Sequence, residues 1–433
     1  MATATGSREL ALSRFSMERP LFLLLTGQLI SQTGENLYRV ALLWFVSLSS
    51  HHVTDMVLVG ILQTLPPLLF GGPGGVWLDR HDKKSLMIGV DLLRAFCVLL
   101  IPLLAGLHLL THARLFLLVF LISALSGLFG PALSSILPLI VPREHLLRGN
   151  ALLQTTGQVG LLAGPVIAGL LAVVWSASGE MLLTGGTFFL SALFLAFIRI
   201  SSPHSAPQPS KDSQSRPGMV AEIAEGIRFV LAPPRPLLPA FLFMALFGIV
   251  TGPLNIMLLL LSRHDLSRGA EGFGDLTGAF GAGMLLSTLI VTVYTPKNVM
   301  RFMVGGLALA GVLSFGVVET RSYRLDLVLF FFWGAAVNVV SPLSQTLIQH
   351  LTPRRLLARV LTVMGVGFLL GILAGILLFP PISSTLGTRS VFGFMGLLLL
   401  TPLLAIGTVR LLKALRKTLP SFDAPPENGR ASS

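Results

Sequence analysis

Five polar side chains lie on one stripe of the first long apolar run. Counted from the first of them, they stand at offsets of 4, 7, 8 and 11 residues, the spacing of one face of an α-helix. They are Gln28, Gln32, Glu35, Asn36 and Arg39. A carboxylate inside such a run can exchange a proton, and Arg39 is placed to pair with Glu35. Two interpretations stay open: Glu35 carries a proton beside a cavity lined by the amides, or the stripe is an ion pair and amides that order the helix.

A second pair of opposite charges lies in the third apolar run. Asp91 and Arg94 are three residues apart, and both lie within about two helical turns of the start of that run. A charge inside a bilayer costs on the order of 2.5 to 3.5 kcal/mol, so each charge needs a partner or a function. Their position favours a structural role with the basic loop at residues 79–84 over direct proton transport.

Composition places most of the chain in lipid. Of the 433 residues, 53% are hydrophobic and only 12% are charged, whereas a soluble domain is typically about one quarter charged. Twelve runs are long enough to cross a bilayer, which takes roughly 17 to 25 residues. They cover 21–49, 53–78, 86–110, 114–140, 150–175, 181–200, 237–261, 272–295, 302–318, 325–347, 356–380 and 390–412. The predicted fold class is an all-α integral membrane protein with twelve transmembrane helices.

The distribution of Lys and Arg predicts the orientation. Basic residues in short loops resist translocation across the membrane. Most of the 31 Lys and Arg fall in the N-terminus, in the connections after even-numbered runs and in the C-terminus, so both termini are expected in the cytoplasm of a cell-membrane protein. The net charge of +12 follows from this asymmetry and does not indicate nucleic acid, which would need basic residues gathered on a soluble face.

The chain divides into two halves of six runs. Residues 201–218 are rich in Ser, Pro and Gln, as in a linker, and 219–231 then place apolar residues on one face, as in a helix on the membrane surface. The predicted domains are an N-terminal arm with the first bundle (1–200), a cytoplasmic linker with a surface helix (201–236), a second bundle (237–412) and a cytoplasmic tail (413–433).

A shift of 211 positions superimposes parts of the fifth and eleventh runs and the loops before them, which indicates a duplication. The shift places Pro142 on Pro353, Arg143 on Arg354, Arg148 on Arg359, Gly160 on Gly371 and Gly164 on Gly375.

A basic motif stands between the second and third runs. It has the spacing Gly-x3-Asp-Arg-x2-Lys-Lys and consists of Gly75, Asp79, Arg80, Lys83 and Lys84. This spacing resembles the loop between helices 2 and 3 of the major facilitator superfamily, which often has Gly where this chain has Asp82. The resemblance implies two six-helix pseudo-repeats, a substrate path between them and a loop that stabilises the outward-open state through contacts near the eleventh run. The corresponding loop of the second half keeps Lys297 and Arg301 but no Asp, so any such switch is expected in the first half.

Other segments resemble the branch of that superfamily that contains enterobactin exporters and macrolide efflux proteins. They are Gly27 to Gln32 with Gly34 and Glu35, Asp91 to Ala95, and Arg148 to Ala151. That branch more often has Asp where Glu35 stands.

The fifth run resembles the antiporter motif of exporting members, with Ala168 in place of a Gly. The residues that match are Gly160, Gly164, Pro165 and Gly169. Physically, the glycines indicate close helix packing and the proline a bend, so a purely structural role stays open. The resemblance favours efflux.

The second half offers a different set of polar groups and no acidic residue that corresponds to Glu35. Asn255, Asn338 and Gln345 lie among the aromatic residues Phe247, Phe331, Phe332 and Trp333. A cavity with one acidic wall and one aromatic wall would suit an amphipathic organic molecule. The alternative is that these aromatic side chains face lipid.

Several other classes of protein lack their signatures. No phosphate-binding loop of the form Gly-x4-Gly-Lys-Ser/Thr is present, so ATP-driven transport by this chain is not expected. The histidines show no metal-ligand spacing, and the single cysteine, Cys97, cannot form an internal disulfide. We expect neither an enzyme nor a bound metal or cofactor.

These features predict a monomeric secondary transporter that exports a small amphipathic molecule in exchange for protons. Two alternatives remain: an importer or lipid flippase of the same fold, and a membrane receptor or assembly partner that transports nothing.

Overall fold

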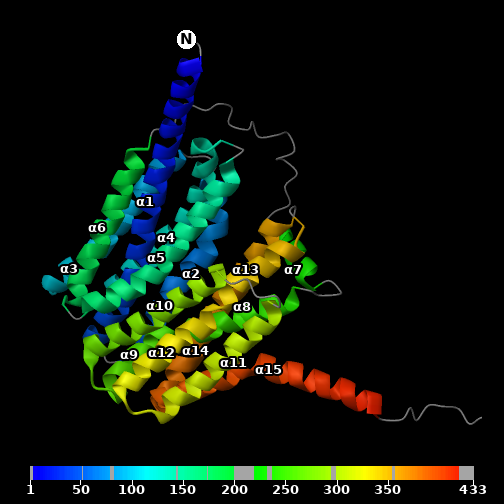
Figure 1. Cartoon of the computed structure of the whole chain (residues 1–433). Helices are drawn as coiled ribbons and strands as arrows, with labels where there is room; N and C mark the ends of the chain where they lie inside the picture. The colour runs from blue at the N-terminus through cyan, green and yellow to red at the C-terminus, as the bar shows by residue number, and fades with distance from the viewer. Residues whose placement is uncertain are drawn as a thin grey trace, which may run out of the picture.

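Both halves of the chain are built from helices in the computed structural model (Figure 1). It describes residues 3–50, 52–78, 82–142, 145–172, 174–198, 219–231, 237–293, 299–353 and 356–418. The first half contains α1 (Thr3–Ser49), α2 (Val53–Leu78), α3 (Lys83–Gly106), α4 (His112–Ile140), α5 (Leu146–Ala172) and α6 (Ala177–Ala196). The linker contains α7 (Met219–Leu231). The second half contains α8 (Leu238–Thr251), α9 (Leu254–Leu260), the π-helical turn η3 (Leu261–Asp265), α10 (Gly269–Val293), α11 (Val299–Glu319), α12 (Tyr323–Asn338), α13 (Val340–Leu351), α14 (Leu357–Leu386) and α15 (Thr388–Thr418). The described ranges contain no strand, which confirms the all-α class.

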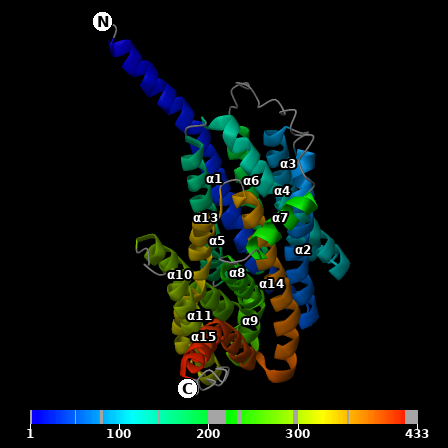
Figure 2. The ribbon, with the colours of Figure 1, turned by 90° about the vertical axis from the view of Figure 1, so that its right-hand side faces the viewer.

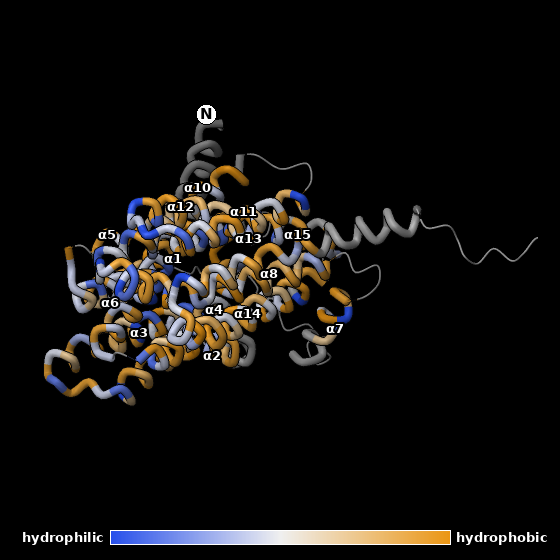
Figure 3. The backbone as a smooth tube through the Cα atoms, turned by 90° about the horizontal axis from the view of Figure 1, so that it is seen from below, coloured by the Kyte–Doolittle hydropathy of each residue, from blue (hydrophilic) through white to orange (hydrophobic). Residues whose placement is uncertain are grey.

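Nine stretches within the described ranges are long and apolar enough to cross a membrane. The three predicted runs outside this set, 21–49, 150–175 and 390–412, fall on α1, α5 and α15. Apolar residues dominate the helices in Figure 3, and large apolar side chains such as Phe96 and Phe189 are more than half exposed. Such surfaces suit hydrocarbon rather than water. The count of twelve crossings stays a prediction.

The terminal helices are longer than the sequence predicts. α1 begins at Thr3 and continues through Pro20, where we expected a separate arm, and α15 runs to Thr418, into the predicted tail. Residues 8–19 consist largely of Arg, Glu, Leu, Ala and Met, which are strong helix formers, so the helix extends once the membrane segment has nucleated it.

Two predicted runs are broken, each beside a proline. The run 237–261 divides at Gly252 and Pro253 into α8 and α9, and the run 325–347 divides after Asn338 into α12 and α13. Pro342 stands four residues beyond Asn338, and a proline ring clashes with the carbonyl four residues before it. Both breaks therefore have a local steric cause.

Close approach of helices at glycine organises each half. A Cβ at Gly160 of α5 would lie 2.6 Å from Gln32 Cβ of α1, and one at Gly164 would overlap Asn36. In the second half, the repeat-related Gly371 and Gly375 of α14 approach the backbone of α8 in the same way. The two members of each repeat pair thus make equivalent contacts with the first helix of their own half, which supports the duplication.

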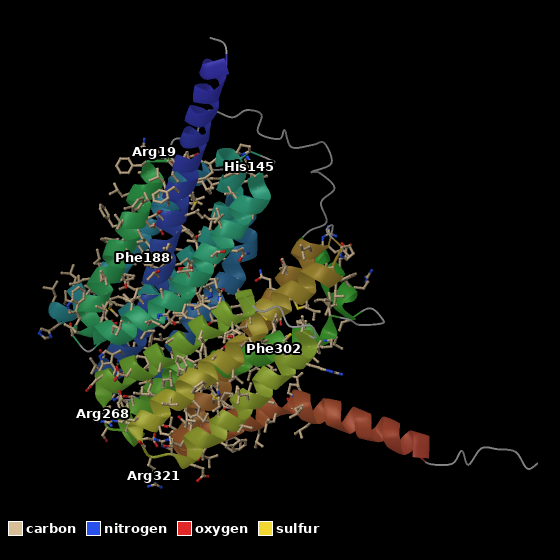
Figure 4. All side chains as sticks on the ribbon, in the orientation of Figure 1. Arg19, His145, Phe188, Arg268, Phe302 and Arg321 are labelled. Atoms are coloured by element: carbon tan, nitrogen blue, oxygen red, sulfur yellow. The ribbon has the colours of Figure 1, made fainter. Side chains whose placement is uncertain are left out.

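The apolar core is shared at one end of the molecule and divided at the other. The largest cluster combines the latter part of α1 with α9, α10 and α12, so it joins the halves at what we call the joined end. The other clusters belong to one half each: one to α1, α3, α4, α5 and α6, the other to α7, α8, α13 and α14. These mark the separated end. Arg19 and His145 lie at the separated end of the first half, and Arg268 and Arg321 lie at the joined end (Figure 4).

Candidate functional site

Glu35 lies at the centre of a cluster of charged side chains inside the first half. Its Oε1 atom is 3.0 Å from Nη2 of Arg39 on the next turn of α1. Its other oxygen, Oε2, pairs with Nη2 of Arg94 in α3. The ion pair that the i, i+4 spacing allows is therefore present, and a second arginine from another helix joins it.

Arg94 brings together two groups that the sequence analysis kept apart. Its Nη1 atom lies 3.2 Å from Asp91 Oδ1, and the exposed fractions of the Arg94 and Asp91 side chains are 1% and 0%. Side chains of α1 and α6 contact this pair inside the first half. The predicted grouping with Asp79 and Arg80 falls outside the described residues and stays a prediction.

Side chains from α1, α4 and α6 complete the surroundings of this pair. Ser191 Oγ donates to Asp91 Oδ2 at 2.7 Å, and Ser31 Oγ lies 3.4 Å from Oδ1. The Arg94 guanidinium lies over the ring of Phe188, with Cζ 4.0 Å from the centroid, and 5.8 Å from that of Phe129. We did not predict these four residues, because Ser and Phe are common in apolar helices. A partial signal was the position of Ser31, one turn before Glu35.

The cluster is electrically balanced when both carboxylates are ionised. Glu35 and Asp91 then carry two negative charges, and Arg39 and Arg94 carry two positive charges. Buried ions are costly unless opposite charges and hydrogen bonds compensate them, which explains why the four groups occur together. Glu35 and Arg39 form the accessible side of the cluster, with exposed fractions of 15% and 38%. Glu35 is therefore the carboxylate that a proton can reach most directly.

The amides of the predicted stripe differ in their surroundings. Asn36 Nδ2 donates to the backbone oxygen of Gln32 at 2.8 Å, so its amide caps a local carbonyl. Gln28 is buried, and its Oε1 has no partner within the described part of the chain. Gln32 is half-buried at the contact with α5. Asn36 is thus a packing residue in this conformation, while Gln28 keeps an acceptor available.

The antiporter-like motif of α5 packs directly on this stripe. Gly160 and Gly164 contact α1, while Gly169 faces the backbone of α10 at Gly274 in the other half. Pro165 lies within the helix between these contacts. The motif therefore connects the polar face of α1 with the interface between the halves.

The predicted polar residues of the second half do not form a comparable cluster. Asn338 Nδ2 donates to Met284 O at 3.1 Å and Thr288 Oγ1 at 3.0 Å, which ties α12 to α10 where α12 breaks. Asn255 and Gln345 are half-buried in α9 and α13. Among the predicted aromatic residues, Trp333 is fully buried and donates to Ser314 Oγ at 2.8 Å, so its role is structural.

The second half does bury a carboxylate that the sequence analysis missed. Asp326 of α12 is 0% exposed and pairs with Arg389 of α15, with Oδ2 to Nη2 at 2.8 Å. Arg389 also donates to Val317 O at 2.6 Å. The cluster lies near the joined end, so it fastens three helices of the second half there. Asp326 inside a predicted apolar run was the available signal.

The basic motif before α3 is described only in part. Asp79 and Arg80 lie outside the described residues, and Gly75 lies in α2. Lys83 begins α3, and Lys84 Nζ donates to the last carbonyl of α6, Ala196 O, at 2.8 Å.

Asp82 accepts a hydrogen bond from Ser85 N at 2.9 Å as the N-cap of α3. The hydrogen bonds from Ser85 lower the pKa of Asp82 below its usual value. A helix cap explains why this chain tolerates Asp at a position where the motif often has Gly.

Comparison with known proteins agrees with this architecture. A family model described as Major Facilitator Superfamily matches residues 24–375. Macrolide efflux protein A of Streptococcus pyogenes is 25% identical over 86% of this chain and 92% of its own length. The multidrug efflux pump Tap of Mycolicibacterium fortuitum is 26% identical over 90% of this chain and 94% of its own.

The fold also matches solved structures. The crystal structure of a bacterial homologue of the human lysosomal transporter Spinster aligns with a TM-score of 0.67 at 14% identity, covering 89% of this chain and 95% of that protein. The family match extends over most of the chain and includes the polar stripe of α1, the charged pair of α3 and the glycines of α5. The chain belongs to the major facilitator superfamily of membrane transporters.

Proposed function

We propose that this transporter exports a small amphipathic organic molecule in exchange for protons, and that Glu35 carries the proton. The observation that supports this role is the position of Glu35, a partly exposed carboxylate held between Arg39 and Arg94 at the meeting point of α1 and α3. The names of the macrolide and multidrug efflux relatives support the substrate class and the direction.

Protonation of Glu35 gives a direct mechanical signal. A neutral carboxyl group attracts both guanidinium groups less strongly, so proton uptake loosens α1 from α3 at this point. Arg39 is the more exposed arginine and is free to turn toward solvent or an incoming substrate, whereas Arg94 stays held by Asp91 and Phe188. Substrate and proton then compete for the same state of the cluster, which is the basis of exchange.

The arrangement of the two halves supports a mechanism of alternating access. The halves share a core at the joined end and have their own cores at the separated end. In Figure 2, α1 to α6 lie mainly above α8 to α15, with α14 beside α2. With the N-terminus in the cytoplasm, as the basic residues predict, the separated end faces the cytoplasm.

Transport by inside-out vesicles tests the proposal. An acidic lumen should drive uptake of erythromycin into vesicles that contain the full chain, and Glu35→Gln should abolish this uptake without lowering the amount of folded protein. Glu271→Gln is the matched control, because Glu271 is exposed in the first turn of α10. Uptake by the Glu35 variant at the wild-type rate would refute the proton role, and efflux from the vesicles under the same gradient would indicate an importer.

A susceptibility panel in an efflux-deficient host, with the wild type and the Glu35 variant compared, would identify the compounds that are carried. We further propose that the protein acts as a monomer, which the mass of the purified complex would test.

A further inference from the structure

A groove lies on the outer surface of the second half, away from the charged cluster of α1. It has a volume of about 350 Å³ and is formed by α10, α11 and α12. α11 packs on α12, α13 and α15, which all belong to the second half, so the groove opens to the surroundings of the bundle. Phe302 marks its position on α11 in Figure 4, far from Phe188 of the first half.

The walls of the groove are continuous with the surface that faces hydrocarbon. Ile290, Leu309 and Phe332 line it and are 44%, 52% and 50% exposed. Glycine keeps its floor open: Gly305 is exposed and has no atom within 4 Å of a Cβ position, while Gly306 packs against Ala336 O. An apolar groove that opens into a bilayer will be filled by hydrocarbon chains.

Two polar residues, Arg301 and Ser287, also line this groove. Arg301 is exposed in the first turn of α11 and lines the groove at the end where α10 finishes. Ser287 of α10 also lines it, is 2% exposed, and has a hydroxyl without a partner within the described ranges. The groove therefore pairs an apolar channel with a positive charge and an unused hydroxyl group.

We infer that this groove binds an anionic phospholipid, with an acyl chain between α10, α11 and α12 and the phosphate at Arg301. A guanidinium forms strong charge-assisted hydrogen bonds with phosphate. The connection between α10 and α11 is predicted to be cytoplasmic, and that leaflet is the one that carries anionic lipids. This site is separate from the proposed proton and substrate path, so it does not depend on Glu35.

Lipid binding to the intact, detergent-solubilised protein tests the inference. Native mass spectrometry would measure the dissociation constants of phosphatidylglycerol and of phosphatidylcholine with the same acyl chains. Arg301→Gln should weaken the binding of phosphatidylglycerol about tenfold and leave the binding of phosphatidylcholine unchanged. Gly305→Leu should weaken the binding of both lipids about tenfold, because the leucine side chain fills the groove.

Two control variants keep these outcomes separate from general damage. Gly186→Leu adds the same side chain at another exposed helical glycine with open space around it, on α6, and Arg321→Gln removes an exposed arginine at the joined end. Both should bind the two lipids as the wild type does.

Three results would overturn the inference. One is wild-type lipid binding by both groove variants. Another is binding of inorganic phosphate with the same dissociation constant as phosphatidylglycerol, which would mean that Arg301 holds an anion without the acyl chain. The third is loss of a dimer in place of a lipid in the Gly305 variant, which would mean that a second copy occupies the groove.

Discussion

The guanidinium group of Arg94 in α3 lies over the ring of Phe188 in α6, with Cζ 4.0 Å from the ring centroid. Both side chains are almost completely buried. A cation placed over an aromatic face is attracted by the negative charge density of the ring, and this attraction is strongest where water is excluded. Phe188 therefore holds Arg94 in position while its nitrogen atoms bind the two carboxylates.

Phe188→Leu should lower the free energy of unfolding by about 1 to 2 kcal/mol, because it removes the ring beneath a desolvated cation. Thermal unfolding of the purified protein in detergent would measure this loss. Phe189→Leu is the matched control, since Phe189 is the next residue and is 58% exposed to the surroundings of the bundle. Equal effects of the two changes would contradict the role of the ring.

Asp91→Asn tests the role of Asp91 separately from that of Glu35. The amide can still accept from Ser191, but Arg94 keeps only Glu35 as a charged partner, so we expect a loss of about 1 to 3 kcal/mol in stability. Because Asp91 is fully buried and Glu35 is the accessible group, transport driven by an acidic lumen should persist in this variant. Loss of proton-driven transport by folded Asp91→Asn protein in vesicle assays would transfer the proton role to Asp91.

Gly160→Ala should destabilise the protein by about 1 to 3 kcal/mol, since the new methyl group would meet Gln32 Cβ at 2.6 Å and force α5 away from α1. Gly157→Ala places the same group one turn earlier, where nothing lies within 4 Å. The unfolding temperatures of the two variants would measure this difference in stability. A stable Gly160 variant would show that α1 and α5 are packed less closely.

Arg263→Ala should favour opening of the joined end. Arg263 of η3 donates to Ser47 O of α1, and the ring of Trp44 stacks on Phe273 of α10 nearby, with centroids 6.4 Å apart. Loss of the first contact leaves this ring pair and the shared apolar core to hold the halves together at the joined end.

Spin labels at exposed positions 49 and 264 would report the distance between the two halves at this end, after replacement of Cys97. We expect the fraction with the longer distance to rise severalfold in the Arg263 variant. Arg321→Ala removes an exposed arginine from the same end and should leave the distribution unchanged. An unchanged distribution in both would exclude Arg263 from the contact that closes this end.

The sequence was most informative where one helix contains the whole pattern. The stripe from Gln28 to Arg39 depends only on helical periodicity, and its ion pair is present. The same holds for the repeat-related glycines, since Gly160 and Gly371 make equivalent contacts. The family follows from motifs with fixed spacing, which are also local.

The sequence was least informative where contacts depend on how helices face each other. The link from Arg94 to Glu35 joins residues 59 positions apart, and no periodicity within α3 indicates which neighbour Arg94 meets. Helix breaks were missed for another reason: hydropathy continues through Pro253 and Pro342, whereas each proline removes a backbone hydrogen bond and crowds the preceding turn.

The balance of charges around Glu35 has an electrical consequence. With two carboxylates and two guanidinium groups, the cluster has no net charge, and one added proton makes it singly positive. A charge that moves through the membrane field gains or loses about 2.3 kcal/mol per 100 mV, in proportion to the part of the field it crosses. Under the role we propose for Glu35, the protonated cluster responds to voltage and the unprotonated cluster does not, so loss of the membrane potential would change the speed of only one half of the cycle.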